Sequence, residues 1–249
     1  MKLENIIAKS RGKTIYRDGD KCIKLFDADY SKADVLNEAL NHARVEGIGV
    51  NMPRIIEVTM IDGRWAIVQE YIEGKTLAAL MQENPEDVEK YLNVFVDLQL
   101  NVLSKAAPLL KRLKDKMTDK IDRSGLDACT RYELLARLAG MPKHLKLCHG
   151  DFNPSNVIIR NDGTPFVIDW AHATQGNGSA DAARSYMVFK LEGKDEIAER
   201  YLDLFCEKSS TEKKYVQKWM PIVAASQSVK NNPEEQELLM QWATTVEYH

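Results

Sequence analysis

The spacing of hydrophobic residues changes near residue 71, and this change constrains the fold more than any other feature of the sequence. Before it, β-rich segments such as KTIYR, KCIKLF and RWAIVQEY alternate with Asp-Gly pairs, which are typical of tight hairpin turns. One helix is predicted among them over about residues 31–46, because Ser31 is a good N-cap and Gly47 a good terminator. After residue 84 the hydrophobic residues recur mainly at helical spacing, beginning at an Asn-Pro helix start.

These patterns predict an α+β fold with two lobes. Residues 1–71 are expected to form a small antiparallel β-sheet with one helix, and residues 72–249 a larger, mainly helical lobe. A short β segment over residues 147–170 interrupts the helical pattern. The connector at residues 70–74 is the expected hinge, and we expect the functional cleft beside it.

Composition and charge exclude several classes of protein. The chain has 249 residues, 44% of them hydrophobic and 29% charged, and this is typical of a globular protein. Its formal net charge of −3, without a basic stripe carrying interleaved aromatics, argues against a nucleic-acid partner. The four cysteines have no C-x-x-C spacing, which favours a reducing compartment. Neither a signal-peptide pattern nor a long apolar run is present, so we expect a cytoplasmic protein with no membrane partner.

The segment LCHGDFNPSNVII, residues 147–159, places a His, an Asp and an Asn just before an apolar strand. The segment that continues it, NVIIRNDGTPFVIDW, has two apolar runs around Asp162-Gly163, a favoured two-residue hairpin turn. If these two residues form the loop, Asn156 lies opposite Asp169, and cross-strand partners are about 4.5–5.5 Å apart. Such a pair of oxygen-bearing side chains suits Mg²⁺, which fills its other positions with water and substrate phosphates.

Asp151 adds a carboxylate to this predicted metal site. It lies five residues before Asn156, so even a fully extended chain separates the two by at most about 17 Å. Pro154 is expected to turn the loop and shorten that distance. The polar ends of many hairpins are simply solvated, but the order and spacing of all these residues favour a metal-phosphate site.

At this point the residues resemble a known family. His149-Gly150-Asp151 followed by Asn156 is similar to the H-x-D-x-x-x-x-N catalytic loop of the protein-kinase fold, and Asp169 stands where protein kinases carry D-F-G. HGDFNPSNVII and FVIDW resemble most closely the motifs of the aminoglycoside phosphotransferase and choline kinase family of small-molecule kinases. The resemblance covers about residues 5–190 and implies a two-lobed, protein-kinase-like fold.

The resemblance implies roles for the residues of the catalytic loop. Asp151 would accept the proton, or the hydrogen bond, of the attacking hydroxyl. His149 would belong to the catalytic loop, where its ring is expected to brace the loop through hydrogen bonds. Asp181, in GSADAARSY, would support the same loop, and Asn156 and Asp169 would hold the metal.

The resemblance also implies a nucleotide-binding site in residues 1–71. Lys24, in CIKLF, would pair with phosphate oxygens and be oriented by Glu38, although Glu46 competes for that role. The remaining expected nucleotide contacts are the phosphate-covering loop, which has one glycine where protein kinases have three, and the hinge backbone that would face the adenine: Ser10, Arg11 and Gly12, then Glu70, Tyr71 and Ile72.

Together these features predict an ATP-dependent (or GTP-dependent) and Mg²⁺-dependent phosphotransferase. Its partners would be a nucleoside triphosphate and a small hydroxylated acceptor, such as an aminoglycoside, a choline-like amino alcohol or a sugar. The alternatives are a nucleotide-binding scaffold without catalysis and, less in keeping with Gly150 and Trp170, a protein kinase.

An acidic cluster near the end of the chain bears on the choice of acceptor. Glu234, Glu235 and Glu237 follow Pro233 and would suit a cationic acceptor. Acidic residues in the first turn of an exposed helix explain the same cluster equally well. The sequence leaves both readings open.

Overall fold

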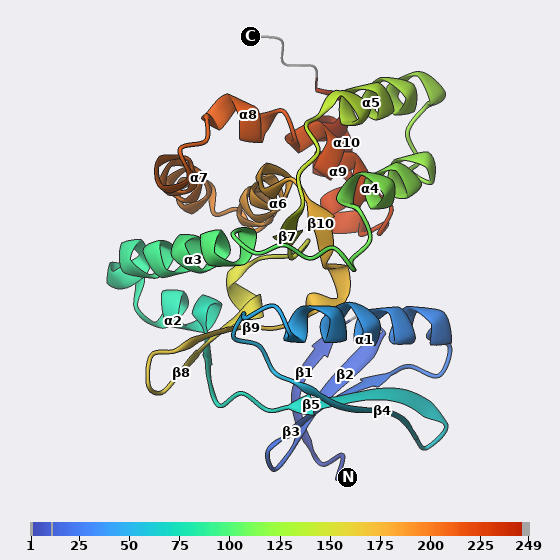
Figure 1. Cartoon of the computed structure of the whole chain (residues 1–249), viewed down its shortest axis with the longest axis vertical. Coiled ribbons are helices and arrows are strands. Elements are labelled where there is room, and N and C mark those ends of the chain that lie inside the picture. Colours follow the sequence, from blue (N-terminus) through green and yellow to red (C-terminus); the bar gives the residue numbers. More distant parts are fainter. Residues whose placement is uncertain (1, 11, 246–249) are drawn as a thin grey trace. The chain divides into compact units, whose positions relative to one another are not determined.

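A computed structural model describes residues 2–10 and 12–245 of the chain. By packing, the chain divides into two compact units (Figure 1). The first unit contains the residues up to Asp87 together with Pro154–Ala173, and the second contains Val88–Asn153 and the residues from Thr174 onward. The division expected between residues 71 and 72 stays a prediction about functional lobes, whereas these units describe packing.

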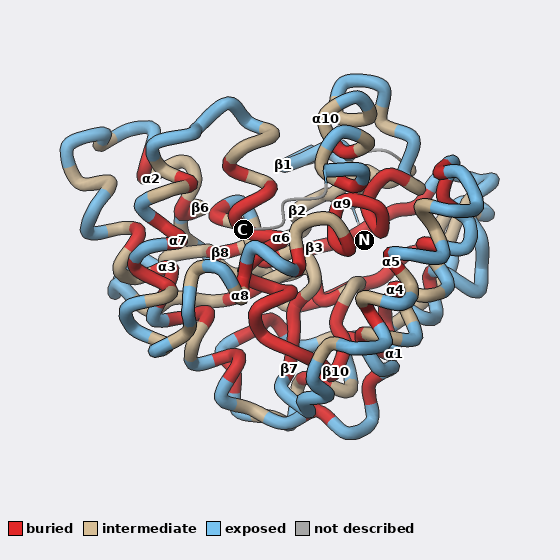
Figure 2. The backbone as a smooth tube through the Cα atoms, turned by 90° about the horizontal axis from the view of Figure 1, so that it is seen from above, coloured by how far each residue is buried: buried red, intermediate tan, exposed pale blue. Residues whose placement is uncertain are grey.

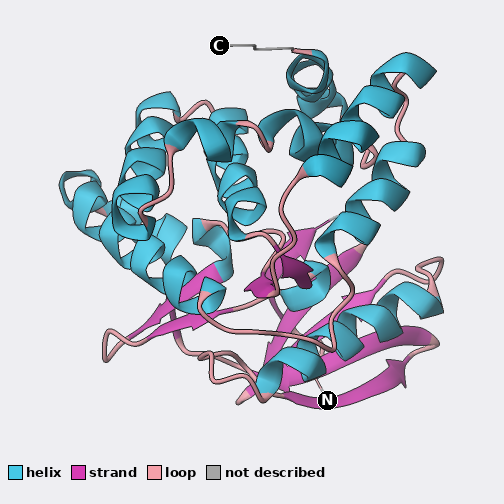
Figure 3. Ribbon diagram, turned by 45° about the horizontal axis from the view of Figure 1, so that its top comes forward, coloured by secondary structure: helices cyan, strands magenta, loops and turns pink. Residues whose placement is uncertain are grey.

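The first unit is built on a five-stranded antiparallel sheet with strand order β1-β2-β3-β5-β4 (magenta in Figure 3). One helix, α1, lies along one face of the sheet (Figure 1). The bounds are β1 Asn5–Ser10, β2 Lys13–Asp18, β3 Lys21–Phe26, α1 Lys32–Glu46, β4 Ile55–Ile61 and β5 Arg64–Glu70. The helix prediction is confirmed, because α1 follows the N-cap Ser31 and ends at Glu46, just before the C-cap Gly47.

Strand alternation divides the side chains of β3 between the two faces of the sheet. Ile23 and Leu25 pack against β5 on one face. Phe26 belongs to the cluster that packs against α1 on the other. Lys24 has the same parity as Phe26, so its side chain lies on the face that α1 covers.

A small three-stranded sheet completes the first unit. Its strand order is β6-β8-β9. The remaining elements of the unit are β6 Gly74–Thr76, α2 Leu77–Glu83, a 3₁₀ turn at Pro85–Asp87, another at Pro154–Asn156, β8 Val157–Arg160, β9 Pro165–Val167 and a third 3₁₀ turn at Trp170–His172. β8 and β9 therefore come from the second half of the chain, yet they pack within the first unit.

The hairpin of β8 and β9 differs from its prediction in loop length. Ile159 pairs with Pro165, and the Arg160 N–H donates to the Thr164 carbonyl at 3.0 Å. The loop therefore holds three residues and not two. Gly163, with φ 83°, takes the left-handed conformation that ends such a loop without steric cost.

This one-residue difference changes the partner of Asn156. The Ile168 N–H donates to the Asn156 carbonyl at 2.9 Å, so the prediction that Asn156 lies opposite Asp169 is wrong by one residue. A one-residue slip normally turns a side chain to the other face of a sheet. Asp169, however, has left the strand conformation, with φ 62° and ψ 63°, and its own backbone directs its carboxylate.

The second unit is mainly helical, with β7 and β10 paired antiparallel inside it. Its elements are α3 Val88–Leu103, α4 Leu113–Asp122, α5 Ala128–Gly140, β7 Lys146–Cys148, β10 Thr174–Gly176, α6 Gly178–Leu191, α7 Asp195–Ser209, α8 Lys213–Gln217, α9 Met220–Ser228 and α10 Pro233–Thr244. The predicted α+β class is confirmed, with one sheet-rich part and one larger helical part.

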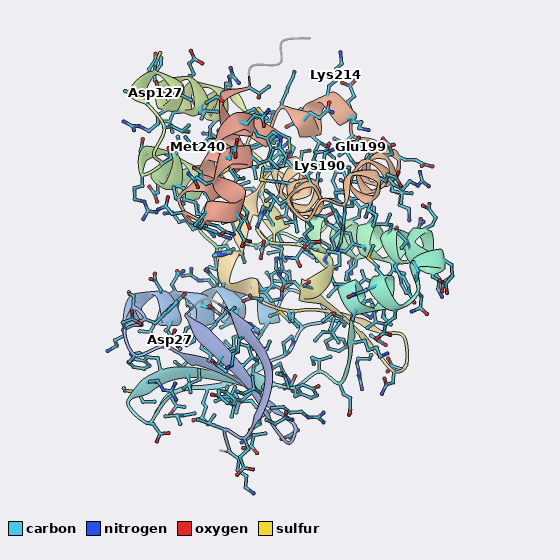
Figure 4. The ribbon with its side chains drawn as sticks, turned by 180° about the vertical axis from the view of Figure 1, so that it is seen from behind. Asp27, Asp127, Lys190, Glu199, Lys214 and Met240 are labelled. Atoms are coloured by element: carbon cyan, nitrogen blue, oxygen red, sulfur yellow. The ribbon has the colours of Figure 1, made fainter. Side chains whose placement is uncertain are left out.

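Helix α6 is the centre of the second unit. Nearly all of its residues are buried (Figure 2), and it packs against α7, α8 and α9. At its C-terminal end, Lys190 lies 3.6 Å from Glu199 of α7 (Figure 4). A helix buried on all sides holds its polar side chains in fixed surroundings, which makes α6 a rigid support for the loop that follows β7. Within residues 2–10 and 12–245, the structure contains no helix with both the length and the hydrophobicity that a membrane span requires.

Candidate functional site

Four charged side chains meet on the α1 face of the sheet in the first unit. Lys24 Nζ lies 2.9 Å from Glu38 Oε1 and 2.9 Å from Asp169 Oδ1. Lys13 Nζ lies 3.5 Å from Glu38 Oε1 and 3.7 Å from Asp169 Oδ2. The cluster is thus two ammonium groups interleaved with two carboxylates, and buried charges are tolerated when they are paired in this way.

The charge state of Lys24 follows from these contacts. Burial alone would lower the pKa of its ammonium group, but the charges and hydrogen bonds of Asp169 and Glu38 outweigh burial and raise that pKa above its ordinary value. Lys24 therefore stays protonated at neutral pH. It forms a fixed positive charge beside the Asp169 carboxylate, whose side chain is 30% exposed.

The structure separates the two glutamates that competed for Lys24. Glu38 contacts the lysine directly, whereas Glu46 Oε1 accepts a hydrogen bond of 2.6 Å from the Ile55 N–H. Periodicity could not distinguish them, because both lie on α1. The distinction comes from position along the helix: Glu46 is its last residue and meets the start of β4.

Two residues that sequence reasoning missed help to build this cluster. Lys13 opens β2, and the β2–β3 register places it opposite Phe26, on the face that carries Lys24. Counting back from the β2–β3 turn would have found it. Asn41 of α1 donates to the Ala171 carbonyl at 3.0 Å and so anchors the 3₁₀ turn that follows Asp169. No local pattern in the sequence marks that long-range bond.

The donor chemistry of Asn156 and Asp169 fits a hard cation. A carboxylate and a carboxamide, one ladder position apart, supply oxygen ligands only. Among residues 2–10 and 12–245, no group of three or more His, Cys, Asp or Glu side chains forms a metal cage. Mg²⁺ takes one or two protein carboxylates and completes its shell with phosphates and water.

The predicted phosphate-covering loop is the β1–β2 hairpin turn. Ser10 pairs with Lys13 across the hairpin, and Arg11 lies outside the described residues. Gly12 has φ 82°, and a Cβ built on it would come within 2.9 Å of the Tyr30 ring. Only glycine fits this backbone at this distance from the ring.

The expected hinge, residues 70–72, continues β5 into a loop. The Glu70 N–H donates to the Arg54 carbonyl and the Tyr71 N–H to the Asp20 carbonyl, at 2.9 and 2.8 Å. These two donors are therefore already used by the first unit itself. The two bonds use the N–H groups of Glu70 and Tyr71 and do not involve that of Ile72.

In the second unit, the loop after β7 is held by α6. Asp181 accepts hydrogen bonds from the N–H groups of His149 and Gly150, at 3.3 and 2.6 Å. Burial raises the pKa of the Asp181 carboxyl, while His149 and the two N–H donors oppose that rise. Gly150, with φ 81°, allows the sharp turn that brings both N–H groups to one carboxylate.

Asp151 follows directly in this loop, and a basic residue holds its carboxylate. Its N–H donates to His149 Nδ1 at 3.2 Å, and its Oδ1 accepts a hydrogen bond of 2.9 Å from Arg184. His149 is fully buried and contacts the Phe152 ring edge to face. Arg184 is a residue that sequence reasoning missed, although its spacing of three from Asp181 on one helix was a usable signal.

The neighbouring thiol is not a second reactive group. Cys148 is fully buried in β7, and burial raises the pKa of its thiol well above the ordinary value. A thiol that stays protonated is a poor nucleophile, so Cys148 acts as a small packed side chain.

One known protein family matches the part of the chain that holds both the charged cluster of the first unit and the Asp151 loop of the second. The model of the family described as the phosphotransferase enzyme family matches residues 13–216. The chain belongs to this phosphotransferase family. The matched region contains Lys13, Lys24, Asp151, Asn156 and Asp169. The recognised family and the predicted enzyme class, a small-molecule kinase, are confirmed at this level.

Solved structures of other phosphotransferases share the fold. A thermostable mutant of aminoglycoside phosphotransferase APH(4)-Ia, in ternary complex with ADP and hygromycin B, is 12% identical with a TM-score of 0.67, covering 97% of this chain and 94% of that one. Choline kinase LicA from Streptococcus pneumoniae is 14% identical with a TM-score of 0.63, covering 95% and 86%.

A third structure extends this likeness. Aminoglycoside phosphotransferase APH(3'')-Id from Streptomyces rimosus is 15% identical with a TM-score of 0.56, covering 87% of this chain and 91% of that one. Comparison with curated protein sequences gave no significant match. At these identities the likeness establishes the fold, and the protein-kinase-like fold predicted from the motifs is confirmed.

Proposed function

We propose that the chain transfers the γ-phosphoryl group of ATP (or GTP) to a hydroxyl of a small molecule in a Mg²⁺-dependent reaction. The observation that carries this proposal is the contact of Lys24 with both Glu38 and Asp169. Phosphoryl transfer needs charge neutralisation around the transferring group and little covalent participation by the protein. A lysine held in its charged form, beside a carboxylate able to bind a cation, meets that need. ADP and AMP-PNP in solved phosphotransferases of this fold support a nucleotide as the donor.

Each candidate site residue of the first unit then has a proposed role. Lys24, oriented by Glu38, pairs with phosphate oxygens of the nucleotide. Asn156 and Asp169 would hold Mg²⁺, which supplies charge neutralisation to the phosphates when bound. The remaining proposed nucleotide contacts are Ser10, Arg11 and Gly12 at the phosphates and the backbone of Glu70, Tyr71 and Ile72 at the adenine. Because the Glu70 and Tyr71 N–H groups are engaged, the adenine contacts would use carbonyls of this segment and the Ile72 N–H.

The loop of the second unit supplies the acceptor chemistry. Asp151 accepts the proton of the acceptor hydroxyl as the new oxygen–phosphorus bond forms and the bond to the departing diphosphate breaks. ADP leaves with that bonding pair. His149 and Asp181 keep the loop in place through the hydrogen bonds described above, and Arg184 orients the carboxylate of Asp151.

Acceptors to consider are aminoglycosides, choline-like amino alcohols and sugars. The named relatives include an enzyme solved with hygromycin B and a choline kinase. The alternative functions are a nucleotide-binding scaffold and a protein kinase. A scaffold has no use for Asp151, and the family match favours a phosphotransferase.

The test uses Asp151→Asn, which keeps the shape of the side chain and removes its basicity. We expect turnover to fall by about 10²–10⁴-fold, the usual contribution of general-base catalysis, with the nucleotide affinity changed little. The measurement is ADP release with Mg·ATP and a panel of aminoglycosides, amino alcohols and sugars, with nucleotide binding followed by calorimetry.

Asp122→Asn is the matched control, because Asp122 is an exposed carboxylate at the end of α4. It is expected to behave as wild type in both measurements. If Asp151→Asn kept the turnover of wild type, the proposed role of Asp151 would be contradicted. Nucleotide binding without turnover of any acceptor by the wild type would favour the scaffold.

A further inference from the structure

Basic side chains gather around Asp151 within the second unit. Lys116 and Lys120 lie one turn apart on α4, so they project from the same side of the helix. That side flanks the buried stripe of the helix, formed by Leu113, Met117 and Ile121. Both lysines are partly buried.

Two further cations join these lysines. α9 packs against both α4 and α6, Lys230 follows α9 closely, and Arg184 lies on α6. Lys116 interacts electrostatically with Lys230 and Asp151, and Lys120 interacts with Lys116, Lys230, Arg184 and Asp151. We call Lys116, Lys120, Arg184 and Lys230 the basic cluster.

The surroundings of the two lysines disfavour their charged forms. Burial, together with repulsion from Lys230, lowers the pKa of Lys116 to about 8. Burial, together with repulsion from Lys116 and Lys230, lowers the pKa of Lys120 to about 7. Attraction to Asp151 opposes both shifts and does not overcome them. A bound anion would oppose both shifts in the same direction as Asp151 does.

Arg184 gives a second, independent indication of a ligand. It is 9% exposed, and one terminal nitrogen donates to Asp151. Its Nε and its other terminal nitrogen are buried and have no hydrogen-bond partner in the part of the chain that the structure describes. An unsatisfied buried donor destabilises the folded protein, and more so when the group is charged. Guanidinium N–H groups match the oxygens of carboxylate and phosphate in geometry.

The two carboxylates that act on the lysines of the cluster, Asp151 and Asp181, already accept hydrogen bonds. Asp181 accepts the N–H groups of His149 and Gly150, and Asp151 accepts Arg184. The glutamates that would suit a cationic acceptor belong to α10: Glu234 and Glu235 are in its first turn, and Glu237 is exposed one turn later. A favourable interaction with the helix dipole accounts for the first two without a ligand.

We propose that the phosphate acceptor carries an anionic group, a phosphate or a carboxylate, and that the basic cluster binds this group. That the bound anion is the phosphate acceptor rests on the proposed function, because there Asp151 accepts the proton of the hydroxyl of the same molecule. It selects sugar phosphates, hydroxy acids and related anionic alcohols, and it disfavours cationic aminoglycosides and choline.

The first test does not depend on turnover. Sulfate is the probe, because it mimics a phosphate group and does not titrate near neutral pH. Its binding in the absence of nucleotide is measured by calorimetry for wild type, for the double variant Lys116→Gln/Lys120→Gln and for Lys218→Gln. Lys218 is exposed at the end of α8 and serves as the matched control.

We expect the double variant to bind sulfate at least about tenfold more weakly, since each hydrogen bond between charged groups contributes about 1.5–3 kcal/mol. Lys218→Gln should bind as wild type does. Unchanged sulfate affinity in the double variant, with its fold verified by circular dichroism, would overturn the inference.

The second test compares acceptors that differ by one anionic group. Glycerol is paired with glycerol 3-phosphate and glucosamine with glucosamine 6-phosphate, and ADP release is measured with Mg·ATP. We expect the anionic member of a pair to have the higher kcat/KM, and the double variant to lose that preference. Preference for the neutral or cationic members would overturn the inference and leave the proposed function standing. No turnover of any acceptor would count against the proposed function, while sulfate binding would still decide the inference.

Discussion

The charged cluster of the first unit shows how single residues depend on one another. Lys24 is held between Glu38 and Asp169, and Lys13 lies 3.5 and 3.7 Å from the same two carboxylates. Removing one partner of a buried ion pair is far more costly than removing both, because a lone buried charge remains. Lys13 is placed to limit that cost when Lys24 is lost.

A double-mutant cycle with Lys13→Met and Lys24→Met tests this interdependence. Methionine keeps the apolar length of the side chain and removes its charge. We expect the loss of unfolding free energy in the double variant to exceed the sum of the two single losses by about 0.5–3 kcal/mol. This is the range for residues that share partners. The measurement is the free energy of unfolding in urea, with exposed Lys9→Met as the control. Additive effects would mean that Lys13 does not compensate the charges of Glu38 and Asp169 when Lys24 is lost.

Helix α4 depends on a strand that is far from it in sequence. Gln175 of β10 is 9% exposed, and its side-chain amide donates to the carbonyls of Pro108 and Leu110, at 3.1 and 2.8 Å. Its backbone N–H donates to the Lys111 carbonyl at 3.1 Å. These bonds fix the segment that leads into α4 and hence the position of Lys116 and Lys120.

Gln175→Leu is expected to loosen this entry to α4. Leucine has a similar volume but leaves two carbonyls without donors, so we expect the free energy of unfolding to fall by about 1–3 kcal/mol. Sulfate should bind more weakly as well, because α4 carries two residues of the basic cluster. Urea unfolding and calorimetry measure these effects, with Gln217→Leu, at an exposed position of α8, as the control. Wild-type stability in Gln175→Leu would show that the segment is held by other contacts.

At the scale of the whole molecule, the depressed lysine pKa values couple stability to pH. In the unfolded chain both lysines have an ordinary pKa of 10.5, whereas the folded values are about 8 and about 7. Between pH 7 and pH 10 the unfolded chain therefore binds more protons than the folded one. Stability must rise with pH wherever this holds.

We therefore expect the stability of wild type, relative to Lys116→Gln/Lys120→Gln, to increase from pH 7 to pH 9. Comparison with the double variant cancels the contributions of the other titrating groups. The measurement is the free energy of unfolding by urea at intervals across that range. A difference that stays flat, or that falls with pH, would contradict the placement of these lysines in a partly buried, positively charged region.

The sequence by itself determined the local features of this protein. Ser31 and Gly47 mark the ends of α1, and the β-rich segments form the five-stranded sheet, because capping and strand alternation act over a few residues. The motif around Asp151 and Asn156 identified the family for a related reason. Its chemistry lies in residues close together in the chain, so it can be read without a tertiary structure.

The tertiary structure alone decided what depends on distant segments. It chose Glu38 over Glu46, added Lys13 and Arg184, and set the β8–β9 register one residue from its prediction. An Asp-Gly pair is compatible with loops of two or three residues, so the turn does not define the register without its context. The basic cluster comes from residues on α4 and α6 and after α9. The sequence keeps them up to 114 residues apart, and only the packing of α9 against α4 and α6 brings them together.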